Sequence, residues 1–445
     1  MFERLNKLFQ PLAVAIGRNK YLMSIRDGFL VATPLLITGS IFLLIANFPI
    51  PAVTEFFNSV IINPETQATL ADYLAVPADA TYTIMAVFAV AGIAYAFSKR
   101  MAVKPIFGAV TALMSWFILM PFQLTQTPLG AVEDAPAVTV TGIDLGWMGA
   151  KGIFIGIICA FLSVHIYAWV NKKGWKIRMP EEVPENVVET FSSLIPILFV
   201  MCFFFLVNLL FGLAGTNAFE FIYKFLQIPL LNLGDTLGSM IIAYIFLHFF
   251  WFFGINGGSV VGAVFNPILQ TLSLENVKFF QTGVGQAHII NQQFQDLFAT
   301  FGGAGSTLSL AIAMIVVCRS KRMKELGKLA LVPGIFNINE PIIFGMPIVL
   351  NPIMIVPFML APTVNIIISY FVMRIGLVPI TSGINIPWPT PAIISGFLAT
   401  NWAGALLQAG LLVIDFFIYL PFLKVLDNQY VAEEKGSVEP AKVAE

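Results

Sequence analysis

The sequence predicts an all-α polytopic membrane protein with about ten transmembrane helices, two re-entrant hairpins and amphipathic surface helices. Composition is the first reason, because 58% of the 445 residues are hydrophobic, only 11% are charged, and the mean hydropathy is +0.85. The second reason is that apolar stretches long enough to cross a bilayer recur along the chain. The third is that lysine and arginine gather between alternate stretches.

The predicted membrane crossings begin and end near polar, charged or helix-breaking residues. They are residues 28–48, 82–97, 105–122, 149–170, 194–213, 236–253, 260–274, 306–317, 348–375 and 402–423. An even number of crossings places both ends of the chain on the same side of the membrane.

Basic residues indicate which side that is. Of the 24 lysines and arginines, 17 lie in four segments: before residue 28, around 99–104, around 172–178 and around 319–328. Residues 49–81 and 121–147 contain none. Because positively charged loops stay on the cytoplasmic side, both termini and the basic loops are predicted to be cytoplasmic.

The N-terminus has the pattern of a helix that lies on a membrane surface. Arg4, Lys7, Arg18 and Lys20 are interspersed with leucine, isoleucine and phenylalanine. The segment lacks the short apolar core and cleavage site of a signal peptide, so we expect it to be retained.

The chain divides into two predicted membrane domains and a tail. Residues 1–190 contain regular apolar stretches, whereas the stretches of residues 191–426 are interrupted by Gly, Asn, Gln and His, as expected for re-entrant hairpins that line a cavity. The boundary is placed in the charged, proline-containing linker 171–189, with an outer limit near residue 230. Residues 427–445 are predicted to form a disordered cytoplasmic tail.

A carboxylate in the second domain is the strongest functional signal. Glu340 follows Asn337 and Asn339 in the sequence FNINEPIIFG, which helix breakers bracket. A carboxylate at the bilayer centre costs roughly 2.5 to 3.5 kcal/mol, so Glu340 is expected to face a cavity rather than lipid. Pro341 disfavours helical geometry at Glu340 and leaves backbone groups that a polar ligand can satisfy. The alternative is a structural turn in which Glu340 pairs with a buried donor.

A glycine-rich break follows an aromatic run at residues 248–259. Asn256 and Gly257 lie in this break, where glycine allows a ligand to approach the backbone and the amide can hydrogen-bond to it. No P-loop lysine or dinucleotide-binding glycine pattern accompanies them. We interpret Asn256 and Gly257 as ligand-binding residues and His248, which is alone on an apolar stretch, as structural.

Neutral polar side chains form a further cluster at residues 286–293 and 302–307. His288, Asn291, Gln292 and Ser306 offer hydrogen-bond donors and acceptors without net charge. Such groups suit an uncharged polar ligand, and a sugar fits this description. His288 has two other interpretations, as a structural residue or as part of a proton relay.

A proline-stiffened loop at residues 385–391 presents Trp388. An indole can stack on the apolar face of a sugar ring, so Trp388 is predicted to support the ligand. The alternative is an anchor at the membrane surface.

These motifs together resemble the enzyme IIC family of the bacterial sugar phosphotransferase system, in its lactose/cellobiose (diacetylchitobiose) branch. The resemblance rests on FNINEPIIFG at residues 336–345, WFFGING at 251–257 and the loop Ile386–Trp388, and it covers essentially the whole chain. One position differs. Where the family often has histidine this chain has Asn256, which can hydrogen-bond to a sugar but cannot act as an acid or base near neutral pH.

The resemblance implies a sugar permease, a homodimer of ten-helix protomers in the bacterial cytoplasmic membrane, whose N-terminal half supplies the dimer interface. One β-linked disaccharide would lie between the re-entrant hairpins, supported by Trp388. Glu340 would lie beside its C6 hydroxyl, as a base or as an orienting group. A separate IIB protein, supplied by IIA, HPr and enzyme I, would donate phosphate from a phosphocysteine. The chain would then be a transport component and not an independent enzyme.

No metal, cofactor or nucleic-acid partner is expected. Cys159, Cys202 and Cys318 lie in or at the ends of apolar stretches without the spacing of a zinc site or a disulfide framework. The net charge of −1 gives no basic surface for nucleic acid.

Two other classes of function stay open on the residues alone. A proton- or sodium-coupled secondary sugar transporter could use Glu340 with His288 or Asp296, and it would accumulate unmodified sugar. A membrane enzyme acting on lipid substrates would need a metal set or a second acid near Glu340, for which Asp235 and Asp415 are the next carboxylates in line.

Overall fold

The computed structural model describes residues 19–126, 138–177, 179–180, 183–254, 256–285, 287–346, 348, 351 and 353–435. These residues are mostly helical and form two compact units, each described here by itself. The N-terminal unit contains Arg18–Phe42 and Ala75–Asn232. The C-terminal unit contains Leu43–Leu74 and the chain from Leu233 onward. The predicted N-terminal surface helix lies outside the described residues.

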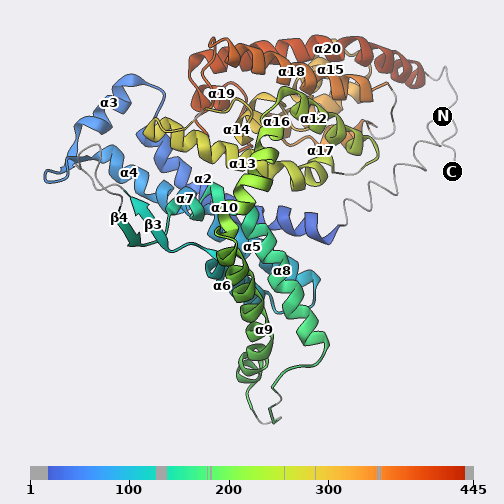
Figure 1. Ribbon diagram of the computed structural model, residues 1–445. Helices are drawn as coiled ribbons and strands as arrows, with labels where there is room; N and C mark the ends of the chain where they lie inside the picture. Colours follow the sequence, from blue (N-terminus) through green and yellow to red (C-terminus); the bar gives the residue numbers. More distant parts are fainter. Residues whose placement is uncertain are drawn as a thin grey trace. The chain divides into compact units, whose positions relative to one another are not determined.

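The N-terminal unit is a bundle of apolar helices of different lengths (Figure 1). Its helices are α2 (Lys20–Ala46, which continues into the other unit), α4 (Leu70–Ala78, which does likewise), α5 (Met85–Arg100), α6 (Pro105–Leu119), α7 (Leu145–Met148), α8 (Ile153–Lys172), α9 (Glu185–Leu213), α10 (Ala218–Ile222) and α11 (Ile228–Gly234). Strands β3 (Gln123–Gln126) and β4 (Val138–Thr141) form an antiparallel pair. Helices α5, α6 and α8 pack against one another.

Small residues allow the closest helix approach in this unit. A Cβ atom added to Gly28 of α2 would lie 2.5 Å from the backbone nitrogen of Ile93 in α5. A Cβ atom on Gly92 would lie 2.7 Å from the carbonyl oxygen of Gly28. Glycine therefore lets α2 and α5 touch backbone to backbone, as is common between helices in membranes.

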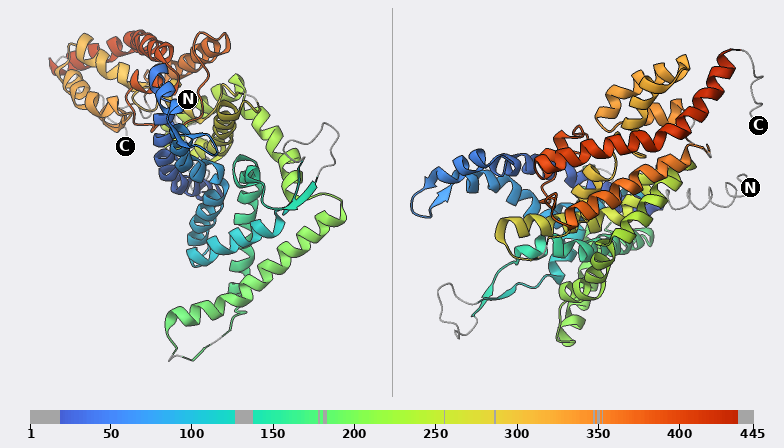
Figure 2. Two further views of the ribbon diagram at one scale, coloured as in Figure 1. Left: turned by 90° about the vertical axis from the view of Figure 1, so that its left-hand side faces the viewer. Right: turned by 90° about the horizontal axis from the view of Figure 1, so that it is seen from above.

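The C-terminal unit combines long helices with short ones at the interrupted stretches. Its elements are α3 (Pro51–Ser59), β1 (Ile61–Asn63), β2 (Ala68–Thr69), α12 (Leu237–Phe252), α13 (Gly257–Thr282), α14 (Gln292–Phe298), α15 (Thr307–Val317), α16 (Lys321–Ile335), α17 (Glu340–Gly345), α18 (Ile355–Arg374), α19 (Ile394–Ala399) and α20 (Trp402–Glu434). Helix α20, in red in Figures 1 and 2, lies beside α18, and α15 packs against both α16 and α20.

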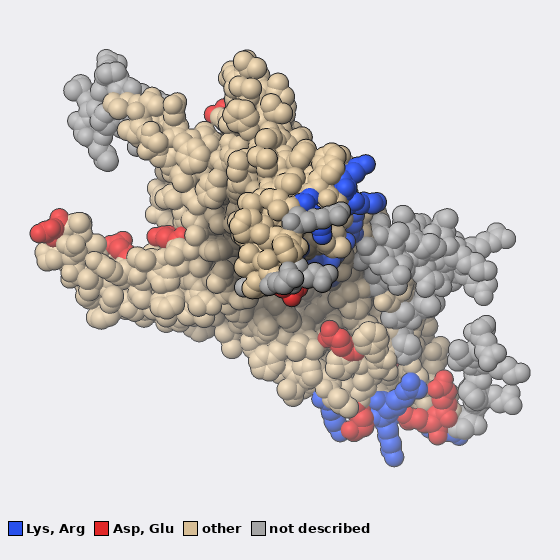
Figure 3. Space-filling view, turned by 90° about the horizontal axis from the view of Figure 1, so that it is seen from below, with Lys and Arg blue, Asp and Glu red and all other residues tan. Residues whose placement is uncertain are grey.

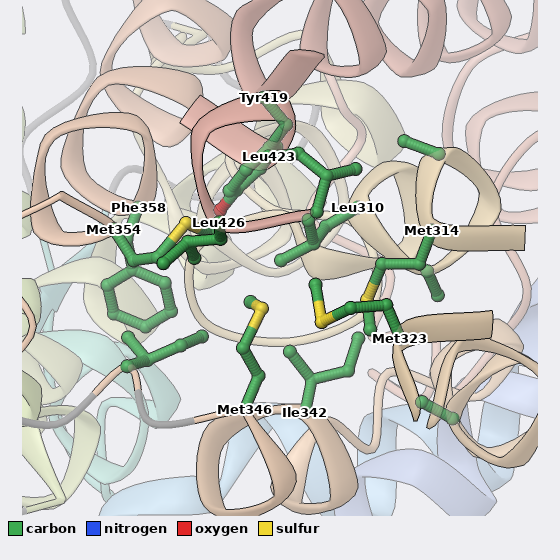
Figure 4. Close-up of a cluster of buried hydrophobic side chains, with 14 of the residues drawn as sticks. Leu310, Met314, Met323, Ile342, Met346, Met354, Phe358, Tyr419, Leu423 and Leu426 are labelled. Carbon is green, nitrogen blue, oxygen red and sulfur yellow. The ribbon is translucent and has the colours of Figure 1, made fainter. Parts of the chain in front are cut away.

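A hydrophobic cluster fixes the position of α17 within this unit (Figure 4). Ile342 and Met346, from α17 and its end, are each only 1% exposed. They lie in the same cluster as Met314 of α15, Met323 of α16 and Leu423 of α20. Burying a side chain of this size stabilises the fold by roughly 1.5 to 3 kcal/mol. The helix that begins with Glu340 is therefore anchored by its apolar face.

Each of the ten predicted membrane crossings overlaps a helix. By length and composition, five helices of the described chain can cross a membrane, or seven if each of two bent helix pairs is one span. Helices α6 and α15 are apolar but shorter. Most of the surface in Figure 3 carries neither acidic nor basic side chains. A mostly helical protein with several helices apolar enough to cross a membrane is therefore confirmed, whereas the number of crossings and the re-entrant hairpins stay predictions.

The two compact units divide the chain after Asn232, close to the predicted outer limit of the domain boundary near residue 230. The boundary between the two membrane domains in the linker 171–189 stays a prediction.

The first residues of the predicted disordered tail, 427–434, are helical. Helix α20 continues to Glu434, because two of its carboxylates bind the start of α16. Asp427 accepts hydrogen bonds from the backbone N–H groups of Arg319 and Ser320 at 2.9–3.0 Å. Glu434 accepts from the Ser320 hydroxyl at 2.6 Å and from the N–H groups of the next two residues. Carboxylates at a helix N-terminus satisfy its free N–H groups and complement its dipole.

Candidate functional site

The turn between α16 and α17 presents Glu340. Helix α16 ends at Ile335, and Asn337 takes a left-handed conformation with φ of 63° that reverses the chain. Glu340 then begins α17, with Pro341 in its first turn, where a missing N–H costs nothing. The Glu340 side chain is exposed and forms no hydrogen bond or ion pair with the described residues. The Glu340 carboxylate is thus exposed and unpaired at the turn between α16 and α17.

Two asparagines join this turn to the glycine-rich loop between α14 and α15. The Asn337 side-chain oxygen accepts from the N–H of Gly302 at 2.7 Å, and the Asn339 amide donates to the carbonyl oxygen of Ala304 at 2.7 Å. Gly303 lies against the turn so closely that a Cβ atom would be 2.8 Å from the Asn337 carbonyl oxygen. Both asparagines therefore hold the Glu340 turn in place. Most hydrogen-bonding groups of their side chains bind other residues of the protein.

Trp388 reaches the same turn through its backbone. The Asn337 amide donates a short hydrogen bond to the Trp388 carbonyl oxygen, although the two residues are 51 positions apart. The Trp388 side chain is 50% exposed. The structure thus brings together Glu340, Trp388 and the 302–305 loop, which the sequence presents as separate motifs.

Ser306 belongs to the support of this loop. It is fully buried, and its hydroxyl accepts from the Phe301 N–H and the Asn365 amide, each at 3.0 Å. Asn365 also donates to the Asp415 carboxylate at 2.9 Å. A ligand at the surface cannot reach Ser306, so we leave it out of the proposed site.

Asn291 and Gln292 are also buried structural residues. Asn291 caps α14 by accepting from the Phe294 N–H at 3.1 Å, and its amide donates to the Thr381 hydroxyl at 2.8 Å. Gln292 donates to the Asp296 carboxylate at 2.9 Å. Asn291 and the Gln292 amide nitrogen thus stabilise the loop, whereas the buried Gln292 side-chain oxygen has no hydrogen-bond partner among the described residues.

His288 lies between two carboxylates in the loop between α13 and α14. Its Nδ1 atom is 2.8 Å from the Asp235 carboxylate and its Nε2 atom is 3.0 Å from the Glu275 carboxylate. Burial lowers the pKa of His288, but the hydrogen bonds and charges of Asp235 and Glu275 outweigh it and raise the pKa to about 9. Both ring nitrogens of His288 are thus engaged by carboxylates, and the raised pKa favours the protonated form.

Asn256 and Gly257 begin α13. The Asn256 side-chain oxygen accepts from the Ser259 N–H at 2.9 Å, which is an N-cap, and its side chain is exposed. A Cβ atom on Gly257 would lie 1.8 Å from the carbonyl oxygen of Leu247. Glycine is thus required for α12 to pack on α13, and within the described residues no hydrogen bond joins Asn256 to Glu340.

Comparisons with known proteins identify the family. The family model "Phosphotransferase system, EIIC" matches residues 26–362. The chain belongs to this EIIC family of the phosphotransferase system. It is 39% identical to the oligo-beta-mannoside-specific EIIC component of Bacillus subtilis, over 98% of this chain and 96% of that protein. It is 38% identical to the cellobiose-specific EIIC component of Geobacillus stearothermophilus, over 96% of this chain and 94% of that protein.

A solved structure agrees with this assignment. The crystal structure of ChbC, the IIC component from the N,N'-diacetylchitobiose-specific phosphotransferase system, matches with a TM-score of 0.91 and 38% identity. The match covers 98% of this chain and 100% of that one. Neither the family model nor these relatives support the predicted alternative of a proton- or sodium-coupled transporter.

His248, predicted to be structural, and Tyr419, which sequence reasoning did not single out, position the glycine-rich loop of this EIIC chain. His248 is buried, contacts the Tyr244 carbonyl oxygen through Nδ1 at 2.7 Å and accepts from the Gly305 N–H at 2.9 Å. The Tyr419 hydroxyl donates a short hydrogen bond to the Gly305 carbonyl oxygen. A histidine or a tyrosine in an apolar stretch indicates a buried polar partner, because its polar atoms must be hydrogen-bonded inside the membrane.

The His288 cluster predicts a pH dependence of stability in the EIIC chain. A raised pKa in the folded state means that the ion pairs contribute fully below about pH 6.5 and are lost as the pH rises through about 9. We expect His288→Asn to destabilise the protein by on the order of 1 to 3 kcal/mol at pH 6.5 and by less at pH 9.5. Thermal unfolding in detergent, followed by intrinsic fluorescence at both pH values, measures the difference; an equal loss at both would contradict the ion-pair assignment.

Proposed function

We propose that this chain is the membrane permease of a sugar phosphotransferase system and carries β-linked disaccharides or short oligosaccharides. The observation that carries the proposal is the unpaired Glu340 carboxylate, held beside the half-exposed Trp388 by the Asn337 side chain. The relatives named above support the substrate class, since one is specific for oligo-beta-mannosides, one for cellobiose and one for diacetylchitobiose.

In the proposed mechanism Trp388 supports one ring of the sugar and Glu340 faces its C6 hydroxyl. The hydroxyl donates a hydrogen bond to the Glu340 carboxylate, which fixes the direction of its lone pairs. Phosphoryl transfer from a separate IIB protein then breaks the phosphorus–sulfur bond of a phosphocysteine and forms a phosphorus–oxygen bond at C6. The hydroxyl proton passes to Glu340 as the new bond forms.

Phosphorylation also favours release. The product carries about two additional negative charges at neutral pH, and once Glu340 has lost the transferred proton to water its carboxylate repels them. Transport and modification are thereby linked, because the cell receives a sugar that the site no longer holds.

The membrane arrangement belongs to the same proposal. We propose ten crossings in the bacterial cytoplasmic membrane, re-entrant hairpins around α14 and α17, and cytoplasmic termini, on the distribution of basic residues. A homodimer through the N-terminal unit is supported by α9, where Leu206, Leu210 and Leu213 are 55%, 65% and 77% exposed. Lipid or a second copy would cover this apolar face. IIA, HPr and enzyme I would supply the phosphate upstream.

Uptake of labelled disaccharides tests the function. Cells that express this chain with its IIB and IIA partners are supplied with radiolabelled cellobiose or diacetylchitobiose, and the internal label is separated by charge. The expected product is the sugar phosphate. Accumulation of unmodified sugar would overturn the proposal in favour of an ion-coupled transporter.

Trp388→Ala is expected to weaken sugar binding by about fivefold, because a stacking contact contributes roughly 1 kcal/mol. Equilibrium binding to the purified protein measures the loss. Trp169→Ala is the matched control, since Trp169 of α8 is 48% exposed and lies in the other unit. Unchanged affinity of Trp388→Ala would favour the membrane-anchor interpretation.

A further inference from the structure

A cavity lies in the C-terminal unit, apart from the residues around Glu340. Its volume is about 280 Å³, close to the lower limit for small-molecule sites. It is bounded by the end of α2, the last turns of α13, the segment 379–384 and the end of α19. None of the proposed sugar-site residues lines it.

The lining of this cavity is mostly apolar, with four polar side chains and no charged residue. Asn47, Gln281, Ser382 and Thr400 contribute amides and hydroxyls, and the remaining wall is aliphatic or aromatic, including Phe280. The Gln281 and Ser382 side chains form no hydrogen bond with any described residue, so their donors and acceptors are open to a ligand. Neutral hydrogen-bonding groups beside apolar surface match the two kinds of surface of a glycoside.

One wall of the cavity is rigidly held. Gly383 has φ of 81°, and a Cβ atom there would lie 2.1 Å from the Ser273 carbonyl oxygen. The Asn276 amide donates to the Thr381 carbonyl oxygen at 2.9 Å. Ser382 lies between these two fixed residues. The cavity therefore has a preformed wall, which lowers the cost of ordering it around a ligand.

The same wall continues to the proposed sugar site. After Ile384 the chain is fixed by Gln293, whose side-chain oxygen accepts from the Ile386 N–H at 2.9 Å. Two residues later comes Trp388, whose carbonyl oxygen binds the Asn337 side chain beside Glu340. A single short segment thus connects the cavity with the turn that bears Glu340.

We propose that this cavity is a first binding station for the incoming sugar, a vestibule on the outer side of the membrane that precedes the Glu340 site. The inference rests on the function proposed above. In the proposed topology the end of α2 precedes residues 49–81, which contain no lysine or arginine and so lie outside. The ligand class is a neutral glycoside, because no lining residue is charged.

Filling the vestibule tests the proposal. In Gln281→Trp a large side chain replaces a lining residue, whereas in Thr282→Trp the same side chain is placed on the adjacent exposed residue, which does not line the cavity. Uptake of labelled cellobiose into cells at low concentration is compared with phosphorylation of cellobiose by phosphorylated IIB in inside-out vesicles. We expect Gln281→Trp to lower uptake at least tenfold more than vesicle phosphorylation, and Thr282→Trp to behave as the wild type.

A second variant makes the test independent of the bulky substitution. Ser382→Cys, in a background with Cys159, Cys202 and Cys318 replaced by alanine, is labelled with a membrane-impermeant thiol reagent with and without cellobiose. Protection by the sugar is expected. Wild-type uptake by Gln281→Trp, equal losses in both assays, or the absence of protection would each overturn the vestibule. Failure of the wild-type protein to phosphorylate cellobiose would instead overturn the proposed function.

Discussion

Glu340→Gln is expected to abolish phosphorylation-coupled sugar uptake while leaving the protein folded and able to bind sugar. The amide has nearly the shape of the carboxylate and can still hydrogen-bond to a hydroxyl, but it cannot take the hydroxyl proton. Losing a general base of this kind lowers the rate of transfer by about 10²- to 10⁴-fold. The measurement is phosphoryl transfer from phosphorylated IIB to labelled sugar in membranes, alongside equilibrium binding.

The control for this substitution is Glu325→Gln. Glu325 is an exposed carboxylate of α16 that pairs with Lys328 at 2.8 Å, and it lies in the same helix that leads to the Glu340 turn. An exposed pair of this kind contributes little, so transfer and stability should stay near wild type. Wild-type transfer by Glu340→Gln would leave Glu340 a structural part of the turn. In that case Asn256→His, which introduces a titratable imidazole, should not alter the pH dependence of transfer either.

Gly303→Ala is expected to disrupt the proposed sugar site, because Gly303 packs against the turn that bears Glu340. Gly303 has φ of 81°, and an added Cβ atom would lie 2.7 Å from the Asn339 side chain and 2.8 Å from the Asn337 carbonyl oxygen. The strained backbone and the overlap together cost about 2 to 5 kcal/mol. The added Cβ atom displaces the turn that bears Glu340. We therefore expect both sugar affinity and phosphoryl transfer to be lost.

Gly376→Ala separates these two contributions. Gly376 has a similar φ of 78°, but nothing lies within 4 Å of its added Cβ atom. It should lose about 1 kcal/mol of stability from the backbone alone and retain sugar binding. Equal behaviour of Gly303→Ala and Gly376→Ala in thermal unfolding and in binding would refute the close packing of the glycine loop on the Glu340 turn.

The positions of the helices were predictable because membrane insertion depends on local properties, namely the length and polarity of each stretch. The Glu340 motif was recognisable for the same reason, since a carboxylate beside Pro341 in an apolar stretch is unusual wherever it folds. The interruptions of the apolar pattern at the short helices α14 and α17 were also recognisable. Local patterns do not predict which of these interruptions contact one another in the folded protein.

The hydrogen-bond partners of the polar side chains could therefore not be predicted from the sequence. Asn291 binds Thr381, 90 positions away, and His288 binds Asp235, 53 positions away. Composition alone made these side chains look like open sugar ligands. In the folded chain the need to satisfy buried polar groups had already engaged them. Trp388 and Glu340 differ because their side chains are exposed and keep their interaction capacity.

The carboxylates at the end of α20 have a consequence for the biosynthesis of this protein. Asp427 and Glu434 satisfy the first N–H groups of α16, the helix whose other end leads to Glu340. A nascent chain acquires Glu340 nearly ninety residues of synthesis before it acquires these caps. At about 5 to 20 residues per second, the turn waits several seconds for its support. The start of α16 is therefore capped only after α20 has been synthesised, and a messenger truncated ahead of Asp427 would encode every proposed sugar ligand without these caps.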